Sequence, residues 1–293
     1  PVPERASAGR DRGSAGRAAT PDGLPDAPEY SGCICAVCDT AAGPDGGRTH
    51  TGGDPVLRFE ALASSSHGNA YIVSDQETHI LIECGLSHKK LQQLSGFRLS
   101  DIIACMVSHE HKDHSACVKD LIASGMPVYM SEGTAAALEL EGSTLEAAEA
   151  VKHQKQITVG TIDIVPFATF HDAKEPLGFL FRSRLDGDVL AFATDTVNLN
   201  YRFPGVNLLA IEANFDKAIL ERCERMPDKV RHRIANTHME IDVLCEYLRK
   251  LDLSACREIY LLHLSDATSH EGHFINKVCR AVPKHIKVTA CPR

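Results

Sequence analysis

A dense cluster of imidazoles around one carboxylate follows an apolar run in the middle of the chain. Residues 107–114 read Val-Ser-His-Glu-His-Lys-Asp-His, so an H-x-H-x-D-H pattern is formed by His109, His111, Asp113 and His114. Such side chains are costly to bury without a partner, and they are ligands that zinc, manganese and iron accept. The apolar run 102–107 predicts a buried strand, and α/β enzymes place their chemistry at the carboxyl ends of strands. The segment therefore predicts a metal site, and a solvated surface charge cluster is the weaker alternative.

Three further candidate ligands follow in chain order, each at the end of an apolar run. His171 closes the run 162–170, Asp195 follows 189–194, and His263 follows 259–262. A lone histidine at a strand end is more often a hydrogen-bonded structural residue, so each position alone leaves that alternative open. Together with the first cluster they fit a pair of divalent ions, which needs about this many ligands and a bridging carboxylate.

With these motifs, the chain resembles the metallo-β-lactamase-fold hydrolases over roughly residues 56–293. Within that superfamily it is most similar to the YycJ/WalJ-type exonuclease group. The metal motif carries the resemblance to the superfamily. The segments that narrow it to the group are residues 63–69, 81–87, 171–179, 193–196, 212–214 and 263–265.

The resemblance implies an α/β fold, the four-layer αβ/βα sandwich, and a division of labour among the ligands. One ion would be held by His109, His111 and His171, and the other by Asp113, His114 and His263. Asp195 would bridge the two ions, which would be zinc or manganese, with iron as a further option. The ions would share a hydroxide that attacks phosphorus in line. The residues expected to act in catalysis are Asp113, Asp195 and His238.

His238 is expected to donate to the scissile phosphate or to the leaving oxygen, and a purely structural histidine is the alternative. Asp172 and Glu175 are candidates for orienting the ligands or the adjacent loop. The Ser/Gly-rich segment 64–69 could meet phosphate oxygens or form a tight turn between strands.

Three positions depart from the group's pattern. Glu83 stands where the superfamily usually has Asp, so the support of the metal loop would differ by one methylene. Phe215 stands where the group tends to carry His, and Asn236-Thr237-His238 stands where it tends to carry H-G-H. These changes leave the metal ligands intact and bear on substrate and direction of attack.

Composition predicts a cytoplasmic enzyme. The 293 residues are 43% hydrophobic, enough for one large core or a core with a small appendage. No apolar run approaches the roughly 20 residues that span a bilayer, and the first 30 residues lack the apolar region of a signal peptide. The 11 cysteines are scattered and odd in number, which is typical of reduced thiols.

Two segments are expected. Residues 1–55 form a low-complexity tail, and residues 56–293 form the hydrolase domain. In the tail, a structural zinc could be held by Cys33, Cys35, Cys38 and His50, although the irregular C-x-C-x-x-C spacing leaves free thiols as the alternative. In the domain, residues 157–193 are expected to be strand-rich with a hairpin turn at 186–188, and 241–251 has helical spacing.

The function that these observations favour is phosphodiester hydrolysis, most of all by a DNA exonuclease or related nuclease. The net charge of −8 disfavours nucleic acid as a partner, whereas a local basic stretch favours it, comprising Arg222, Arg225, Lys229, Arg231 and Arg233. That stretch could also be a solvated helix face. The alternative enzyme is a hydrolase of a thioester, a lactone or a small cyclic phosphodiester on the same centre. A non-enzymatic alternative is a metal-binding scaffold whose Cys-rich tail recruits a partner.

Overall fold

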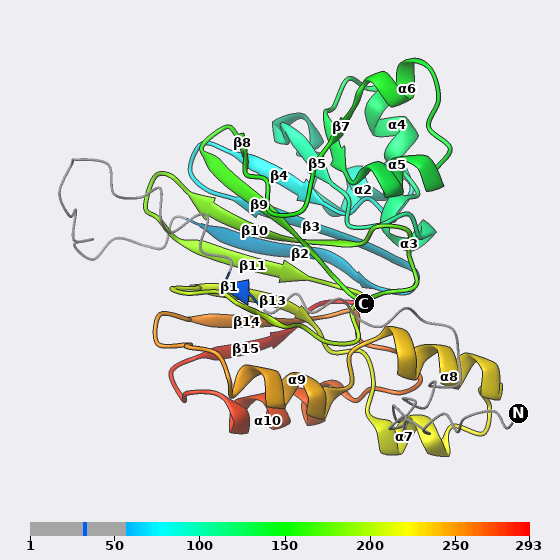
Figure 1. Ribbon diagram of the computed structural model, residues 1–293, viewed down its shortest axis with the longest axis vertical. Coiled ribbons are helices and arrows are strands. Elements are labelled where there is room, and N and C mark those ends of the chain that lie inside the picture. Colours follow the sequence, from blue (N-terminus) through cyan, green and yellow to red (C-terminus); the bar gives the residue numbers. More distant parts are fainter. Residues whose placement is uncertain (1–31, 34–56) are drawn as a thin grey trace, which may run out of the picture.

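The computed structural model describes residues 32–33 and 57–293 of the chain (Figure 1). The predicted tail ligands Cys35, Cys38 and His50 lie outside the described residues, as does nearly all of the predicted low-complexity segment. Of Cys33 only the backbone is described, in the short strand β1 (Gly32–Cys33), which pairs in parallel with β12 (Tyr201–Arg202).

The first sheet has six strands in the order β2-β3-β4-β5-β6-β7. Its bounds are β2 Arg58–Ser65, β3 Gly68–Ser74, β4 His79–Ile82, β5 Ala104–Met106, β6 Val128–Met130 and β7 Ala148–Ala150. β2 to β4 pair antiparallel, and β4 to β7 pair in parallel. The segments between these parallel strands are helical, because parallel neighbours need a crossover. They contain α2 His88–Leu94, the 3₁₀ turn Leu99–Asp101, α3 Lys112–Ser115, α4 Val118–Ala123, α5 Glu132–Ala137 and α6 Ser143–Glu146.

The second sheet has seven strands in the order β15-β14-β13-β11-β10-β9-β8. Its bounds are β8 Ile157–Val159, β9 Ile162–Ala168, β10 Leu177–Ser183, β11 Val189–Ala193, β13 Leu208–Glu212, β14 Glu258–Leu262 and β15 Lys287–Ala290. Its helices are α7 Lys217–Arg222, α8 Asp228–Thr237, α9 Ile241–Leu248 and α10 Glu271–Ala281. None of the helices in the described part of the chain combines the length and apolar character needed to cross a bilayer.

The two sheets lie face to face, with helices on both outer faces (Figure 1). Alternation along each strand sets this arrangement, because successive side chains point to opposite faces. In β4, Ile80 and Ile82 pack into the core between the sheets, whereas Leu81 packs outward against the helices of the first layer. The outer face of the second sheet is covered in the same way by α9 and α10, through residues such as Leu244 and Phe274. The predicted αβ/βα sandwich is confirmed.

Short polar side chains fix where several helices begin. Ser131 accepts a hydrogen bond from the Thr134 N–H at the start of α5. Asp216 and Glu240 do the same for α7 and α9, each accepting from two backbone N–H groups. Such caps satisfy N–H groups that have no partner inside the helix. The predicted hairpin at 186–188 joins the antiparallel pair β10 and β11. The predicted helix over 241–251 ends earlier, at Leu248.

A buried polar network pins the sheets together at the ends of strands remote from those that carry the metal motif. Asp75, between β3 and β4, accepts hydrogen bonds from the Thr161 hydroxyl at 2.7 Å and the Ser183 hydroxyl at 3.1 Å, both on the second sheet's side. It also accepts from the backbone N–H groups of Glu77 and Thr78. Burial alone raises the pKa of Asp75, but these hydrogen bonds outweigh it and hold the pKa below its usual value.

We expect Asp75→Ala to lower the free energy of unfolding by about 2–4 kcal/mol, because it leaves several buried donors without an acceptor. The measurement is chemical denaturation at neutral pH, with Glu77→Ala as the matched control, since Glu77 is exposed in the same turn. Because the pKa of Asp75 is lower in the folded than in the unfolded protein, its carboxylate adds to the free energy of unfolding above the unfolded-state pKa. This contribution is lost as the pH falls through the folded-state pKa. The difference in free energy of unfolding between wild type and Asp75→Ala should therefore become smaller at acidic pH. Equal stability of the two proteins at neutral pH would contradict this assignment.

Candidate metal centre

All seven candidate ligands meet at one edge of the sandwich, where strands of both sheets end. The first sheet supplies the H-x-H-x-D-H cluster, which follows β5 and runs into α3. The second sheet supplies the other three, since His171 follows β9, Asp195 follows β11 and His263 follows β14. Parallel strands bring their carboxyl ends to a common edge, which explains why ligands so distant in sequence converge.

The backbone turns sharply directly after three strands that end at this edge. Glu83 follows β4, Asp195 follows β11 and His263 follows β14, with φ of 62°, 44° and 52° respectively. Left-handed backbone is unfavourable for residues other than glycine, by roughly 1–2 kcal/mol. The three strained residues are all buried and all face the same centre, so the surrounding packing holds their side chains in place.

The donor atoms fall into overlapping groups, each with all members within 4.8 Å of one another. One group is His109, His111 and His171, and a second is Asp113, His114 and His263. Asp195 forms a third group with His109 and His114, and so lies between the first two. A fourth group joins Asp195 and His263 to two further residues, Glu212 and His238.

Hydrogen bonds behind the imidazoles determine which ring nitrogen faces the centre. His171 donates from Nδ1 to the Thr237 carbonyl at 2.8 Å, and Nδ1 of His109 lies 2.8 Å from the Ser108 hydroxyl. Both rings therefore present Nε2 to the centre. Nε2 of His109 and Nε2 of His263 are buried and make no hydrogen bond within the described residues. Buried polar atoms of this kind need a partner, and a metal ion fits that need.

His114 is held from behind by the residue at which the chain departs from the superfamily pattern. Glu83 Oε2 lies 3.5 Å from His114 Nδ1, and Glu83 Oε1 accepts the Ser108 N–H at 3.2 Å. The longer side chain thus supports both the ligand and the loop that carries the cluster. Asn69 also contacts His114, with Nδ2 3.1 Å from Nε2. Burial raises the pKa of Glu83, against the opposing effects of His114 and Ser108.

The Ser/Gly-rich segment is a tight turn, as one of the two sequence interpretations expected. Ser66 and His67 connect β2 to β3, where Ser65 pairs with Gly68. Ser64 is buried, and its hydroxyl accepts the His263 N–H at 2.8 Å. Ser64 therefore positions the loop of a candidate ligand and is not free to meet a phosphate.

Glu212 and Asn214 complete the support of the centre from the second sheet. Glu212 lies at the end of β13, is fully buried, and its Oε1 is 2.6 Å from His238 Nδ1. Its other oxygen accepts the N–H groups of Thr196 and Met239. Asn214 donates to the His263 carbonyl at 2.8 Å. These hydrogen bonds tie together the loops that carry Asp195, His238 and His263.

The direct partners of the carboxylates at the centre are histidines. In the described part of the chain, none of the four pairs with a lysine or arginine: Glu83, Asp113, Asp195 and Glu212. Burial alone raises the pKa of Asp195, yet His263 and His114 outweigh it and hold the pKa well below its usual value. Burial lowers the pKa of His263, but Asp195 and Asp113 outweigh it and raise the pKa to about 10. Among the described residues, imidazoles are thus the only cationic groups in direct contact with these carboxylates. The Arg233 guanidinium, which pairs with Asp172, adds a longer-range attraction to Asp195 and Asp113.

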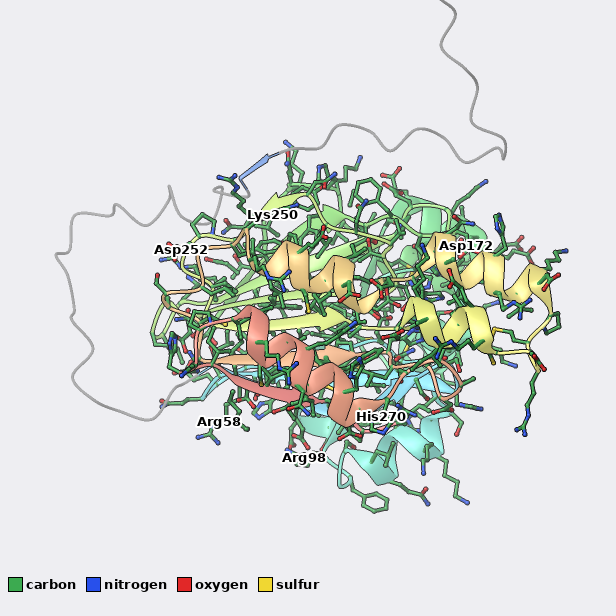
Figure 2. The ribbon with its side chains drawn as sticks, turned by 90° about the horizontal axis from the view of Figure 1, so that it is seen from below. Arg58, Arg98, Asp172, Lys250, Asp252 and His270 are labelled. Atoms are coloured by element: carbon green, nitrogen blue, oxygen red, sulfur yellow. The ribbon has the colours of Figure 1, made fainter. Side chains whose placement is uncertain are left out.

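The predicted accessory residues differ in what they contact. Asp172 lies 3.1 Å from His171 Nε2 and accepts hydrogen bonds from Arg233 of α8, and Figure 2 shows Asp172 beside that helix. Glu175 instead accepts the Gly133 N–H at 2.7 Å, which joins its loop to α5. Arg231 of the predicted basic stretch is also paired, with Asp228.

Sequence reasoning did not assign the supporting roles of Ser64, Asn69, Ser108, Glu212 and Asn214. Segment 212–214 is singled out in the sequence only by its resemblance to a group, and segment 63–69 by that resemblance and as a candidate phosphate contact or tight turn. A polar residue at the end of an apolar strand is the signal that could have identified Glu212, which is fully buried.

Comparison with known proteins agrees with the fold. The chain is 31% identical over 224 residues to a Bacillus anthracis protein named exodeoxyribonuclease YycJ, covering 71% of this chain and 83% of that protein. It is 31% identical over 223 residues to exodeoxyribonuclease WalJ of Streptococcus pneumoniae serotype 2, covering 71% and 82%. The structure matches the metallo-β-lactamase fold protein YhfI from Bacillus subtilis with a TM-score of 0.61 at 15% identity, over 81% of this chain and 97% of that one. The beta-lactamase superfamily domain matches residues 78–264, and the chain belongs to that superfamily.

Proposed function

We propose that this hydrolase is a metal-dependent phosphodiesterase that acts on DNA as an exonuclease. The observation that carries the proposal is a group of four carboxylates, three of them buried, that form no ion pair with a lysine or arginine of residues 57–293 and lie among imidazoles whose donor atoms converge. Uncompensated buried charge is strongly unfavourable, and divalent cations are the partners that this donor set suits.

The ligands divide between two sites in this proposal. His109, His111 and His171 would hold one ion, and Asp113, His114 and His263 would hold the other, with Asp195 available to both. Bound divalent ions would supply a water of lowered pKa and positive charge opposite the phosphate oxygens. The donor groups within 4.8 Å support this division.

His238 is the side chain that we assign to proton transfer. Its Nδ1 is hydrogen-bonded to Glu212, which leaves Nε2 to donate to the scissile phosphate or the leaving oxygen. Burial lowers the pKa of His238, but Glu212 outweighs it and raises the pKa above its usual value. The imidazole is therefore suited to carry a proton near neutral pH.

The substrate class rests on the similar proteins, which are named exodeoxyribonucleases. The second candidate is a hydrolase of a thioester, a lactone or a small cyclic phosphodiester, because the same ligand set serves carbonyl and phosphoryl centres alike. The net charge of −8 favours it, and so does the pairing of Arg231 and Arg233 with carboxylates.

A substrate panel separates the two candidates. The metal-loaded protein should hydrolyse single-stranded DNA, duplex DNA with free ends and bis(p-nitrophenyl) phosphate, and should turn over an activated thioester at least tenfold less efficiently. Covalently closed circular DNA should survive, since an exonuclease needs an end. Efficient thioester hydrolysis with intact DNA would replace the proposed function by the second candidate.

Purified protein should carry close to two divalent ions per chain, as measured by elemental analysis. Adding zinc or manganese to chelated protein should raise the free energy of unfolding, by about 2.7 kcal/mol at a hundredfold excess over Kd. Asp195→Ala should bind fewer ions, because its carboxylate joins the two donor groups. Less than one ion per chain, with no gain in thermal stability on adding either metal, would contradict the ligand assignment.

Asp195→Ala and His111→Ala should each lose hydrolysis by roughly a thousandfold or more while staying folded, since they remove donors and not core volume. Asp101→Ala is the matched control, because Asp101 is an exposed carboxylate. Circular dichroism should show native spectra for all three variants. Turnover like that of wild type in Asp195→Ala or His111→Ala would rule out the proposed site.

A further inference from the structure

A hollow of about 530 Å³ adjoins the candidate metal centre on the side of the first sheet. Its volume is that of a small-ligand pocket, which runs from about 300 to 1,000 Å³. Its lining comes from the turn between β2 and β3, from the loop before α2, and from α2 and α3, and Figure 1 shows α2 and α3 on the side of the first sheet. The lining residues that bear on its role are Ser66, His67, Leu86, Lys90, Lys112 and Asp113. Asp113 also belongs to the centre, so a chain lying in the hollow would reach the ligands.

Two glycines allow the walls of the hollow to pack so closely. A Cβ on Gly85 would lie 1.6 Å from the Asp113 carbonyl oxygen, which no side chain could tolerate. A Cβ on Gly68 would lie 2.3 Å from the Leu86 side chain, and Gly68 has a φ of +149° that favours glycine. The β2–β3 turn, the loop before α2 and helix α3 are thus held in fixed positions around the hollow.

Two lysines line the hollow together with two carboxylates, Asp113 and Asp120. Lys90 on α2 and Lys112 on α3 are both exposed, and neither makes an ion pair within residues 57–293. In the predicted basic stretch, by contrast, Arg231 and Arg233 are paired with Asp228 and Asp172. Leu86 and Ala116 contribute apolar surface to the lining of the hollow.

We propose that this hollow binds an unpaired strand beside the scissile bond, with Lys90 and Lys112 contacting its phosphates. Exposed ammonium groups without protein partners are suited to phosphate oxygens, and the apolar surface of Leu86 and Ala116 suits a sugar or base. A hollow this size admits nucleotides of one strand. The inference rests on the proposed phosphodiesterase function and specifies where its polymeric substrate lies.

The test compares two double variants of the metal-loaded protein. Lys90→Ala/Lys112→Ala removes the cations of the hollow. Lys89→Ala/Lys119→Ala removes the same charge from exposed positions on α2 and α4 that do not line the hollow. The measurement is kcat/KM on a single-stranded DNA 12-mer and on bis(p-nitrophenyl) phosphate, over a range of salt concentrations. Circular dichroism verifies that both variants are folded.

For Lys90→Ala/Lys112→Ala, the ratio of kcat/KM on the 12-mer to that on the small diester should fall at least tenfold. The slope of log kcat/KM against log salt should flatten by about 1.4, since each phosphate contact on a single strand contributes roughly 0.7. The Lys89→Ala/Lys119→Ala variant should keep both the ratio and the slope of wild type, and Lys90→Arg/Lys112→Arg should keep most of both.

The outcomes separate the two proposals. If wild type cleaves the 12-mer while Lys90→Ala/Lys112→Ala keeps the ratio and the salt slope, the hollow is not the strand site although the proposed function stands. The hollow is likewise not the strand site if wild type degrades DNA from duplex ends but does not cleave an unpaired strand, and in that case too the proposed function stands. If wild type hydrolyses neither the 12-mer nor the small diester, both the proposed function and this inference are overturned.

Discussion

Charge balance at one edge of the sandwich is the constraint on which the rest of the structure depends. Four carboxylates lie there, three of them fully or almost fully buried, and within residues 57–293 their direct ion-pair partners are imidazoles and not lysine or arginine: Glu83, Asp113, Asp195 and Glu212. The supporting hydrogen bonds, the left-handed residues and the orientation of each ring all serve to hold these groups at a common point. Proteins seldom assemble such a set without a cation to balance it, which is why we assign ions to it.

The centre is built by both sheets, and hydrogen bonds between side chains and backbone hold its loops in place. The Thr237 carbonyl fixes His171, the Ser64 hydroxyl holds the His263 N–H, and Glu212 gathers the Thr196 and Met239 N–H groups. Strain at Asp195 and His263 is sustained because each lies at the end of a buried central strand. The side chains of the centre are therefore positioned by strand ends and short loops, and not by flexible surface segments.

The strands and the residues that follow them can be predicted from local sequence, whereas the contacts between distant segments cannot. Apolar runs predicted the strands before the H-x-H-x-D-H cluster, Asp195 and His263, because a buried strand shows itself within a few residues. The partnership of Glu212 with His238, or of Glu83 with His114, depends on which strands become neighbours and cannot be inferred from spacing. The sequence allowed Ser64 either to contact phosphate or to lie in a tight turn. Only its burial and its hydrogen bond from the His263 N–H decide between these interpretations. The Asp75 network was not foreseen, since Thr161 and Ser183 reach it from the other sheet.

The spread of the ligands along the chain also bears on folding kinetics. His109 and His263 come from different sheets, and contacts between such distant segments form late because loop closure costs entropy first. The complete centre therefore cannot nucleate folding in the way that a zinc finger does. The cluster from His109 to His114 is different, since its six residues remain neighbours in an unfolded chain and offer a partial site there. Ions bound to that partial site favour the unfolded chain, so the stabilisation gained from metal is a difference between two affinities.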